Sequence, residues 1–252
     1  MNTTVTPKNP ASNLKLKSDL TIVIPATNEA AMILNLLTSL TNQDYPAMRT
    51  TRVLVADAAS TDDTCKIVRS FSDRLNIAVI PGGLPSIGRN AGAALADTPY
   101  VLCLDADIEL ASNLLIRTAI ETAQRKSLHC VTTNIVCRYG NFADKTLYVG
   151  NNMFQQLSRL HKPFSTGMFM LFDRQRFQEL GGFHQQIHFA EDYQLSKQVA
   201  RNRFGIVRGG VFTTNRRFQK MGHAKVARLF FAAAVNSWNP RFFLRDHKYW
   251  ET

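Results

Sequence analysis

The sequence predicts an α/β sandwich with a mainly parallel central sheet. From Leu20 onward, apolar strand-like runs alternate with amphipathic segments, which is the pattern of this fold class. The apolar runs are continuous rather than alternating, as in parallel strands that are buried on both faces. The amphipathic segments have helical spacing, because Ile33, Leu36, Leu37 and Leu40 fall on one side of a helix.

Strands and helices alternate regularly in the first half of the chain. The predicted strands there are 20–26, 51–57, 76–80 and 100–105, and the predicted helices are 29–40, 61–71, 88–96 and 112–126. Ser60 or Thr61 is expected to cap the second helix and Ser112 the fourth. The second half is less regular, with predicted strands at 128–137 and 166–172 and predicted helices at 142–160 and 191–202.

No Pro/Gly/Ser-rich linker divides the 252 residues, so we expect one domain at 19–222. Residues 1–18, rich in Asn, Thr, Ser, Lys and Pro, are expected to form a flexible tail. Residues 223–252 mix basic and aromatic side chains. We expect this amphipathic segment to pack on the domain, on a second copy in a homodimer, or on the inner face of a membrane.

The composition limits the classes of function. Hydrophobic residues make up 45% of the chain and charged residues 19%, which excludes disorder. The formal net charge of +11 favours an anionic partner, such as nucleic acid, a phosphate-rich small molecule or an acidic membrane surface. The four cysteines form no CxxC pair, so we expect thiols and a cytoplasmic location. We expect neither secretion nor a transmembrane anchor.

The strand at 100–105 ends in two acids, Asp105 and Asp107. Side chains two residues apart in a strand point the same way, so these carboxylates are expected to lie side by side and repel each other. A divalent cation, Mg²⁺ or Mn²⁺, would relieve this repulsion and share the rest of its ligand shell with phosphate. The alternative is a turn residue next to a solvated strand end.

Two other predicted strands are followed by polar residues at the edge where ligands bind in parallel sheets. Asp57 could accept hydrogen bonds from a base or a ribose, or simply form a turn. Arg89 lies in "GRNAG", which we expect to open a helix whose N-terminus faces a phosphate or a sugar. A packing role for these glycines is the alternative.

Two charged pairs lie further along the chain. Glu191 and Asp192 begin a predicted helix, where the helix dipole favours acids, but one of them could act as a general base. Arg216 and Arg217 could hold a diphosphate in bidentate fashion, or lie on a solvated face.

Taken together, these segments resemble the family 2 glycosyltransferases of the GT-A fold, which transfer a sugar from a nucleotide diphosphate with inversion. The resemblance covers residues 20–222. It rests on "TIVIPATNEA", "VLVADAASTDDT", "GRNAGAALADTPYVLCLDAD", "STGMFMLFDRQRFQELGGF", "EDYQLSKQVAR" and "RRF". It implies a Rossmann-like, three-layer sandwich.

The resemblance also implies roles for individual residues. Asp192 matches the catalytic base, Glu191 lies on the acceptor side, and Asp107 binds the metal together with Asp105. The implied donor-binding residues are Pro25, Thr27, Glu29, Asp57, Arg89, Asp105, Arg216 and Arg217. The chain departs from the family pattern at Ala58, where a second acid is common, and in lacking the QxxRW motif of processive synthases.

The implied activity is that of a hexosyltransferase that moves one sugar from a UDP or GDP sugar to a glycan or a lipid-linked acceptor. This reaction would belong to cell-surface polysaccharide or glycolipid biosynthesis. One alternative is a nucleotidyltransferase that makes sugar nucleotides, but "IPATNEA" lacks the Gly-rich basic loop that holds a triphosphate. The other is a nucleic-acid-binding protein, but the basic residues are mostly scattered, so no nucleic acid is expected.

Overall fold

The structure is a computed structural model that describes residues 17–187 and 189–245. Most of the predicted N-terminal tail, residues 1–16, and the last residues of the C-terminal segment, 246–252, lie outside the described residues. The strands are β1 (Leu20–Ala26), β2 (Arg52–Asp57), β3 (Asn76–Pro81), β4 (Tyr100–Leu104), β5 (Glu109–Leu110), β6 (Cys130–Cys137), β7 (Phe169–Asp173) and β8 (Phe204–Thr213).

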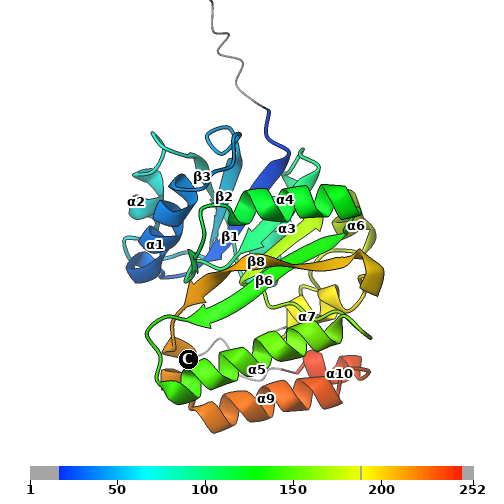
Figure 1. The fold of residues 1–252 in the computed structure, drawn as a ribbon. Helices are drawn as coiled ribbons and strands as arrows, with labels where there is room; N and C mark the ends of the chain where they lie inside the picture. Colours follow the sequence, from blue (N-terminus) through cyan, green and yellow to red (C-terminus); the bar gives the residue numbers. More distant parts are fainter. Residues whose placement is uncertain (1–16, 188, 246–252) are drawn as a thin grey trace, which may run out of the picture.

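The helices follow the predicted alternation and continue past it at the C-terminal end (Figure 1). They are α1 (Ala30–Thr41), α2 (Thr64–Arg69), α3 (Pro85–Ala94), α4 (Leu115–Lys126), α5 (Phe142–Ser158), α6 (Arg174–Glu179), α7 (Glu191–Ser196), α8 (Arg216–Met221), α9 (His223–Val235) and α10 (Pro240–Phe243). A short 3₁₀ helix spans Arg201–Arg203.

Within the described residues the strands form one sheet of eight, in the order β3-β2-β1-β4-β7-β6-β8-β5. The pairs β1–β2, β2–β3, β1–β4 and β6–β8 are parallel. β7 runs antiparallel to both β4 and β6, and β5 runs antiparallel to β8. The sheet is therefore mixed but mainly parallel, and the predicted α/β class is confirmed.

Two apolar layers pack on opposite faces of the sheet. Ile22 and Ile24 of β1 belong to a buried cluster that includes side chains of α1, α2 and α4. Val23, between them, belongs to a second cluster that includes α3, α6 and α7. Neighbouring residues of one strand thus point into different layers, as expected for a strand buried on both faces. The sheet and these two helical layers form the three-layer sandwich.

The start of α3 differs from the prediction. The helix begins at Pro85, so Gly88 and Gly92 lie inside it rather than at its N-terminus. A Cβ on Gly92 would lie only 2.3 Å from Cγ1 of Val23 in β1. These glycines therefore allow α3 to approach the sheet closely. This is the packing role that was given above as the alternative to a helix start facing a ligand. The predicted cap of α2 was also wrong, because this helix begins at Thr64.

The α5 and α9 helices lie side by side at the end of the molecule away from β3 (Figure 1). α5 is attached to β6 where the β6–β8 register shifts between Thr133 and Ile135. Asn152 of α5 exchanges two hydrogen bonds with the backbone of Ile135, and Gln155 donates to the carbonyl of Thr133. Among the described residues, no helix is long and apolar enough to span a bilayer.

Candidate functional site

The first part of the site is built from the loops that follow β1 and β2. The Asn28 side chain accepts a hydrogen bond from the backbone of Thr61 at 2.9 Å, and its own backbone donates to Ser60 Oγ. Asn28 adopts a φ of 52°, a left-handed conformation that asparagine tolerates better than most residues. These bonds hold the two loops together at the carboxyl edge of the sheet.

Asp57 and Thr27 lie at this edge, and Pro25 is buried within β1. One carboxylate oxygen of Asp57 accepts a hydrogen bond from the backbone of Ser60 at 3.1 Å. The other, Oδ1, is buried and has no hydrogen-bond partner among the described residues, although the thiol of Cys65 lies near this carboxylate. Burial and the nearby Asp57 raise the pKa of that thiol. Asp57 therefore keeps an acceptor oxygen available for a ligand.

Arg89 is the centre of the site. Its side chain is only 2% exposed, and it donates to Asp105 at 2.5 Å and to Glu191 at 2.8 Å. Burying a guanidinium is costly unless carboxylates compensate it, and here two of them do. The arginine thereby joins the end of β4 to the start of α7, which are separated by more than eighty residues of sequence.

Gly167 fits closely against Arg89. A Cβ at this position would lie 2.4 Å from Nη2 of Arg89, which real structures do not allow. The backbone N–H of Gly167 also donates to Oδ2 of Asp192 at 2.6 Å. One glycine thus positions both the buried cation and a predicted catalytic carboxylate.

We expect Gly167→Ala to destabilise the protein by about 1–3 kcal/mol through overpacking, and to lower turnover by about 100-fold through displaced side chains. Thermal unfolding and donor turnover would measure these effects. Gly150→Ala is the matched control, since a Cβ there meets nothing within 4 Å and alanine favours the helix. Equal losses in both variants would contradict a specific role for Gly167.

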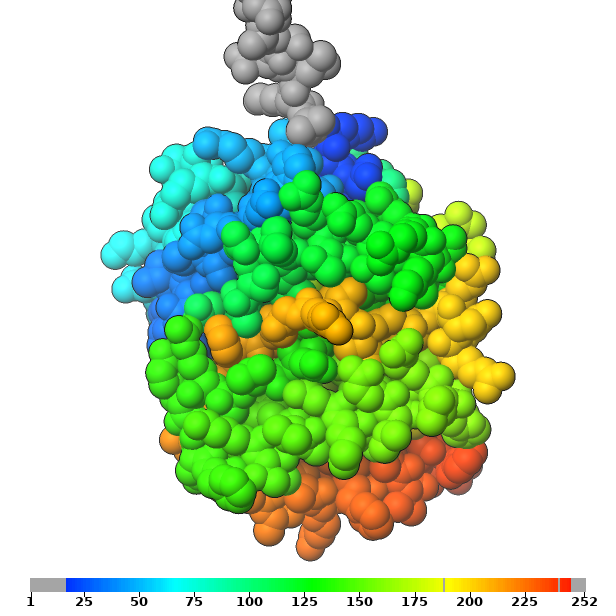
Figure 2. All heavy atoms as spheres, viewed as in Figure 1, coloured from blue at the N-terminus to red at the C-terminus, as the bar shows by residue number. Residues whose placement is uncertain are grey.

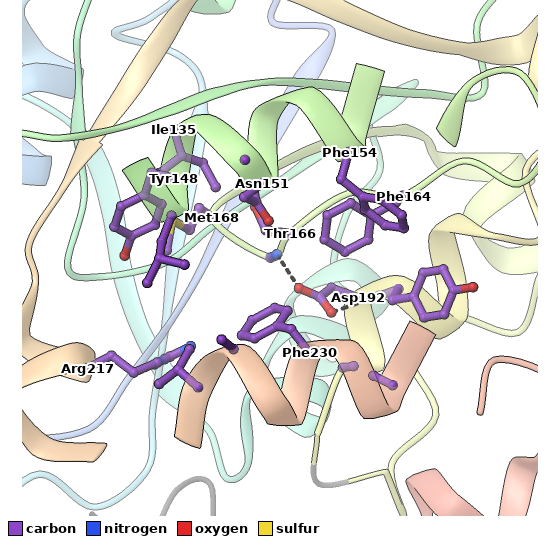
Figure 3. Close-up of a pocket in the computed structure, with 18 of the residues that line it drawn as sticks. Ile135, Tyr148, Asn151, Phe154, Phe164, Thr166, Met168, Asp192, Arg217 and Phe230 are labelled. Atoms are coloured by element: carbon purple, nitrogen blue, oxygen red, sulfur yellow. Dashed lines mark hydrogen bonds between the residues drawn. The ribbon is translucent and has the colours of Figure 1, made fainter. Parts of the chain in front are cut away.

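Asp192 points into a cavity and is held by two backbone hydrogen bonds (Figure 3). Besides the bond from Gly167, its Oδ1 accepts from the N–H of Tyr193 at 2.7 Å. Burial and the adjacent Glu191 raise the pKa of Asp192 to about 7, against the opposing effects of Arg89 and the backbone bonds. A carboxylate with a pKa near neutrality suits general base catalysis.

Asp107 lies next to Arg216. This arginine makes a bidentate pair with Glu29, at 2.7 and 3.0 Å, and also reaches Oδ2 of Asp107 at 3.4 Å. Burial raises the pKa of Asp107, and the negative charges of Asp105 and Glu29 raise it further. The guanidinium of Arg216 therefore offsets part of the negative charge of Glu29 and Asp107.

Asp107 and its neighbours fit a divalent cation only in part. Asp105 is already bound by Arg89, which leaves Asp107 as the carboxylate that could bind a cation directly. In the described part of the chain, no three His, Cys, Asp or Glu side chains gather closely enough to hold a metal ion. Oxygens of a bound diphosphate and water would have to complete the ligand shell.

A cavity of about 460 Å³ extends from Asp192 between α5 and α9. Arg217, Arg89, Asp105 and Glu191 also line it. The rest of the wall is mainly apolar, and Figure 3 shows several of its side chains around Asp192: Ile135, Tyr148, Phe154, Phe164, Met168 and Phe230. None of these six was predicted, because they come from β6, α5, α9 and the segment before β7, and the meeting of these distant segments leaves no local signal.

The structure thus brings most of the predicted residues into two adjoining groups. Glu29, Asp107 and Arg216 form the first group, and Arg89, Asp105, Glu191 and Asp192 form the second. The model of the protein family "Glycosyl transferase family 2" matches residues 21–181 of this chain. The chain belongs to this family. Its membership confirms the resemblance drawn from the sequence motifs.

Curated relatives of this family 2 chain match only part of it. The validoxylamine A glucosyltransferase of Streptomyces hygroscopicus subsp. jinggangensis is 38% identical over 93 residues, or 35% of this chain and 22% of that protein. The poly(ribitol-phosphate) β-N-acetylglucosaminyltransferase TarS of Staphylococcus aureus is 34% identical over 90 residues, or 34% of this chain and 16% of TarS. The chain thus matches about a fifth of each relative's length.

Solved structures extend the likeness to most of the family 2 chain. TarS 1–349 of S. aureus in complex with UDP has a TM-score of 0.65 at 21% identity, over 79% of this chain and 60% of that chain. The mannosyltransferase PcManGT of Pyrobaculum calidifontis, in complex with GDP-Man and Mn²⁺, has a TM-score of 0.68 at 22% identity, over 88% and 65% respectively. These likenesses confirm the predicted GT-A fold.

Proposed function

We propose that the protein transfers one sugar, with inversion, from a nucleotide diphosphate sugar to an acceptor hydroxyl. The observation that carries this proposal is the buried Arg89, which joins Asp105 to Glu191. It sets the acids that follow β4 and the acids that begin α7 around a common space. A donor bound at the acids that follow β4 therefore meets an acceptor bound at the acids that begin α7.

In the proposed reaction Asp192 takes the proton of the acceptor hydroxyl as that oxygen attacks the anomeric carbon of the donor. The two backbone N–H groups that bond Asp192 fix its carboxylate in position. The nucleoside diphosphate leaves from the opposite face of the sugar. As negative charge develops on it, Arg216 and Arg217 stabilise that charge. A divalent cation bound at Asp107 would supply further electrostatic stabilisation of the diphosphate.

Asp57, Thr27 and Pro25 are proposed to border the nucleotide. The available oxygen of Asp57 can accept a hydrogen bond from a base N–H. Relatives of the same fold are described with UDP, UDP-GlcNAc or GDP-Man, which supports a UDP or GDP donor for this chain. We place the reaction in the cytoplasm, in the synthesis of cell-surface polysaccharide or glycolipid.

A thermal-shift screen with UDP, GDP and duplex DNA, followed by donor-hydrolysis assays with metal present, would test this function. Because a ligand that binds only the folded state stabilises it, UDP or GDP should raise the unfolding temperature and the matching nucleotide sugar should be hydrolysed. Duplex DNA should have no effect. Stabilisation by DNA alone, or formation of pyrophosphate from a nucleoside triphosphate and a sugar phosphate, would favour the alternatives.

A further inference from the structure

The α5 helix has its polar and apolar sides reversed. Its buried side chains are Asp144, Gln155 and Ser158, all of them polar. Most of its large apolar side chains lie on the outside, where Val149, Met153 and Leu157 recur at helical spacing and are, with Leu160 just after the helix, each 57–73% exposed. A surface helix ordinarily turns such a stripe toward the core. The outward stripe therefore indicates a contact with something apolar.

The neighbouring C-terminal segment continues this apolar surface. Phe231, Val235 and Trp238 are also 57–73% exposed, and Lys162 just after α5 lies over the ring of Trp238 at 4.7 Å. Figure 2 shows the surface of α5 adjoining that of α9 at the lower end of the molecule. We call these exposed apolar side chains the α5–α9 face: Val149, Met153, Leu157, Leu160, Phe231, Val235 and Trp238.

The same segments are strongly basic. Residues 222–245 contain no acid, and the one acid of 142–162, Asp144, is buried and bonded to Asn141, Asn215 and His223. The basic side chains here are Lys145, Arg159, Lys162, Lys225, Arg228, Arg241 and Arg245. A second copy of this face would bring the same positive charge, which opposes pairing. An anionic lipid surface complements both the charge and the apolar stripe.

The cavity connects this surface to the proposed catalytic carboxylate. Phe154 and Phe231 line the cavity and are also exposed, and Asp192 lines the same cavity. Among the apolar side chains is one amide, Asn151, whose Nδ2 is buried and has no hydrogen-bond partner among the described residues. Figure 3 shows it pointing into the cavity. An apolar passage with a polar group near Asp192 suits an amphipathic molecule.

We propose that the α5–α9 face lies on an anionic membrane and that the cavity holds the hydrocarbon chain of a lipid acceptor. The hydroxyl-bearing head of this lipid reaches Asp192, and Asn151 donates a hydrogen bond to it. The acceptor role rests on the proposed function, because it requires Asp192 to be the general base. Membrane contact and occupation of the cavity can each be measured by binding alone.

Flotation of the full chain with vesicles tests the membrane contact. The protein should bind vesicles of phosphatidylcholine with phosphatidylglycerol, and bind far less to phosphatidylcholine alone. Leu157→Glu should lower binding at least about tenfold, because it replaces an exposed leucine that the membrane contact would bury with a charged side chain. Leu34→Glu, at a similarly exposed leucine of α1, is the control and should bind like the parent. Absence of flotation by the parent would overturn the membrane contact. So would a parent that binds no vesicles but forms a dimer that Leu157→Glu dissociates.

Calorimetry with methyl, hexyl and octyl β-glucosides below their micelle concentrations tests the cavity. The affinity should rise by about fourfold for each CH₂ that enters the cavity. Gly150→Leu projects a side chain into open space at the cavity wall and should abolish this dependence, whereas Gly150→Ala should keep it. Equal affinity of the parent for the methyl and octyl compounds would refute the hydrocarbon site.

Turnover of nucleotide sugars, measured on the same preparation, separates this inference from the proposed function. Turnover without binding of vesicles or alkyl glucosides would refute the inference alone. Binding without any turnover across the donor panel would refute the proposed function, and with it the acceptor role of the cavity.

Discussion

Replacing Asp192 by asparagine is expected to lower donor turnover by about 10²–10⁴-fold, the usual contribution of a general base. The amide is nearly isosteric with the carboxylate but cannot take the acceptor proton. Donor affinity should stay close to that of the parent, because the donor contacts are proposed to lie at Asp107, Glu29 and Asp57. Steady-state kinetics together with calorimetric donor binding would measure both quantities.

The pH profile gives an independent test of the same residue. The pKa of Asp192 is raised to about 7, and only the deprotonated form can act as a base. Turnover by the parent should therefore rise with pH through about 7 and level off above it. Asp192→Asn should lose this dependence, and Glu121→Gln, at an exposed carboxylate of α4, should retain it. Unchanged turnover in Asp192→Asn would exclude the base role.

Replacing Asp107 by asparagine is the second change with a large expected effect. Turnover should fall by about 10²–10³-fold, as when one stabilising group for a developing charge is removed. EDTA should abolish the activity of the parent, and Mn²⁺ or Mg²⁺ should restore it. In Asp107→Asn, a higher metal concentration should be needed. Full activity of the parent in chelator would rule out the metal role of Asp107.

The stability of Asp107→Asn distinguishes a lost ligand from a damaged fold. Folding raises the pKa of Asp107. At pH values above that pKa, its ionised carboxylate therefore lowers the free energy of unfolding. The neutral amide avoids this cost. At neutral pH the variant should therefore unfold at the same temperature as the parent or a higher one. A clear drop in the unfolding temperature would mean that its lost activity reflects the fold.

Much of the sheet and of the proposed donor side could be predicted because their signals are local. A continuous apolar run such as that of β4 identifies a buried strand, and the acids after it mark the strand's carboxyl end. The fit of Arg89 against Gly167 left no such signal, since it depends on two segments nearly eighty residues apart. The "GRNAG" segment was misplaced because glycines favour both a helix start and close packing, and the contact with Val23 decides between them.

The α5–α9 region could be predicted as helical but not as a surface. Periodicity shows that Val149, Met153 and Leu157 share one side of α5, and the natural inference is that this side is buried. The structure reverses it because Asn152 and Gln155 are needed on the inner side, where they bond the backbone of β6 at its register shift. The register shift in β6 thus determines which side chains of α5 are exposed to solvent.

The pairing of Arg216 with Glu29 and Asp107 has a consequence for ligand order. In the structure Arg216, a side chain that is 40% exposed, neutralises the carboxylates of the proposed donor site. A cation arriving alone at Asp107 must compete with this internal counter-ion. A donor diphosphate instead offers the arginine a new partner and frees the carboxylates. With the proposed roles of these residues, donor and cation are thermodynamically coupled, because each increases the affinity of the site for the other.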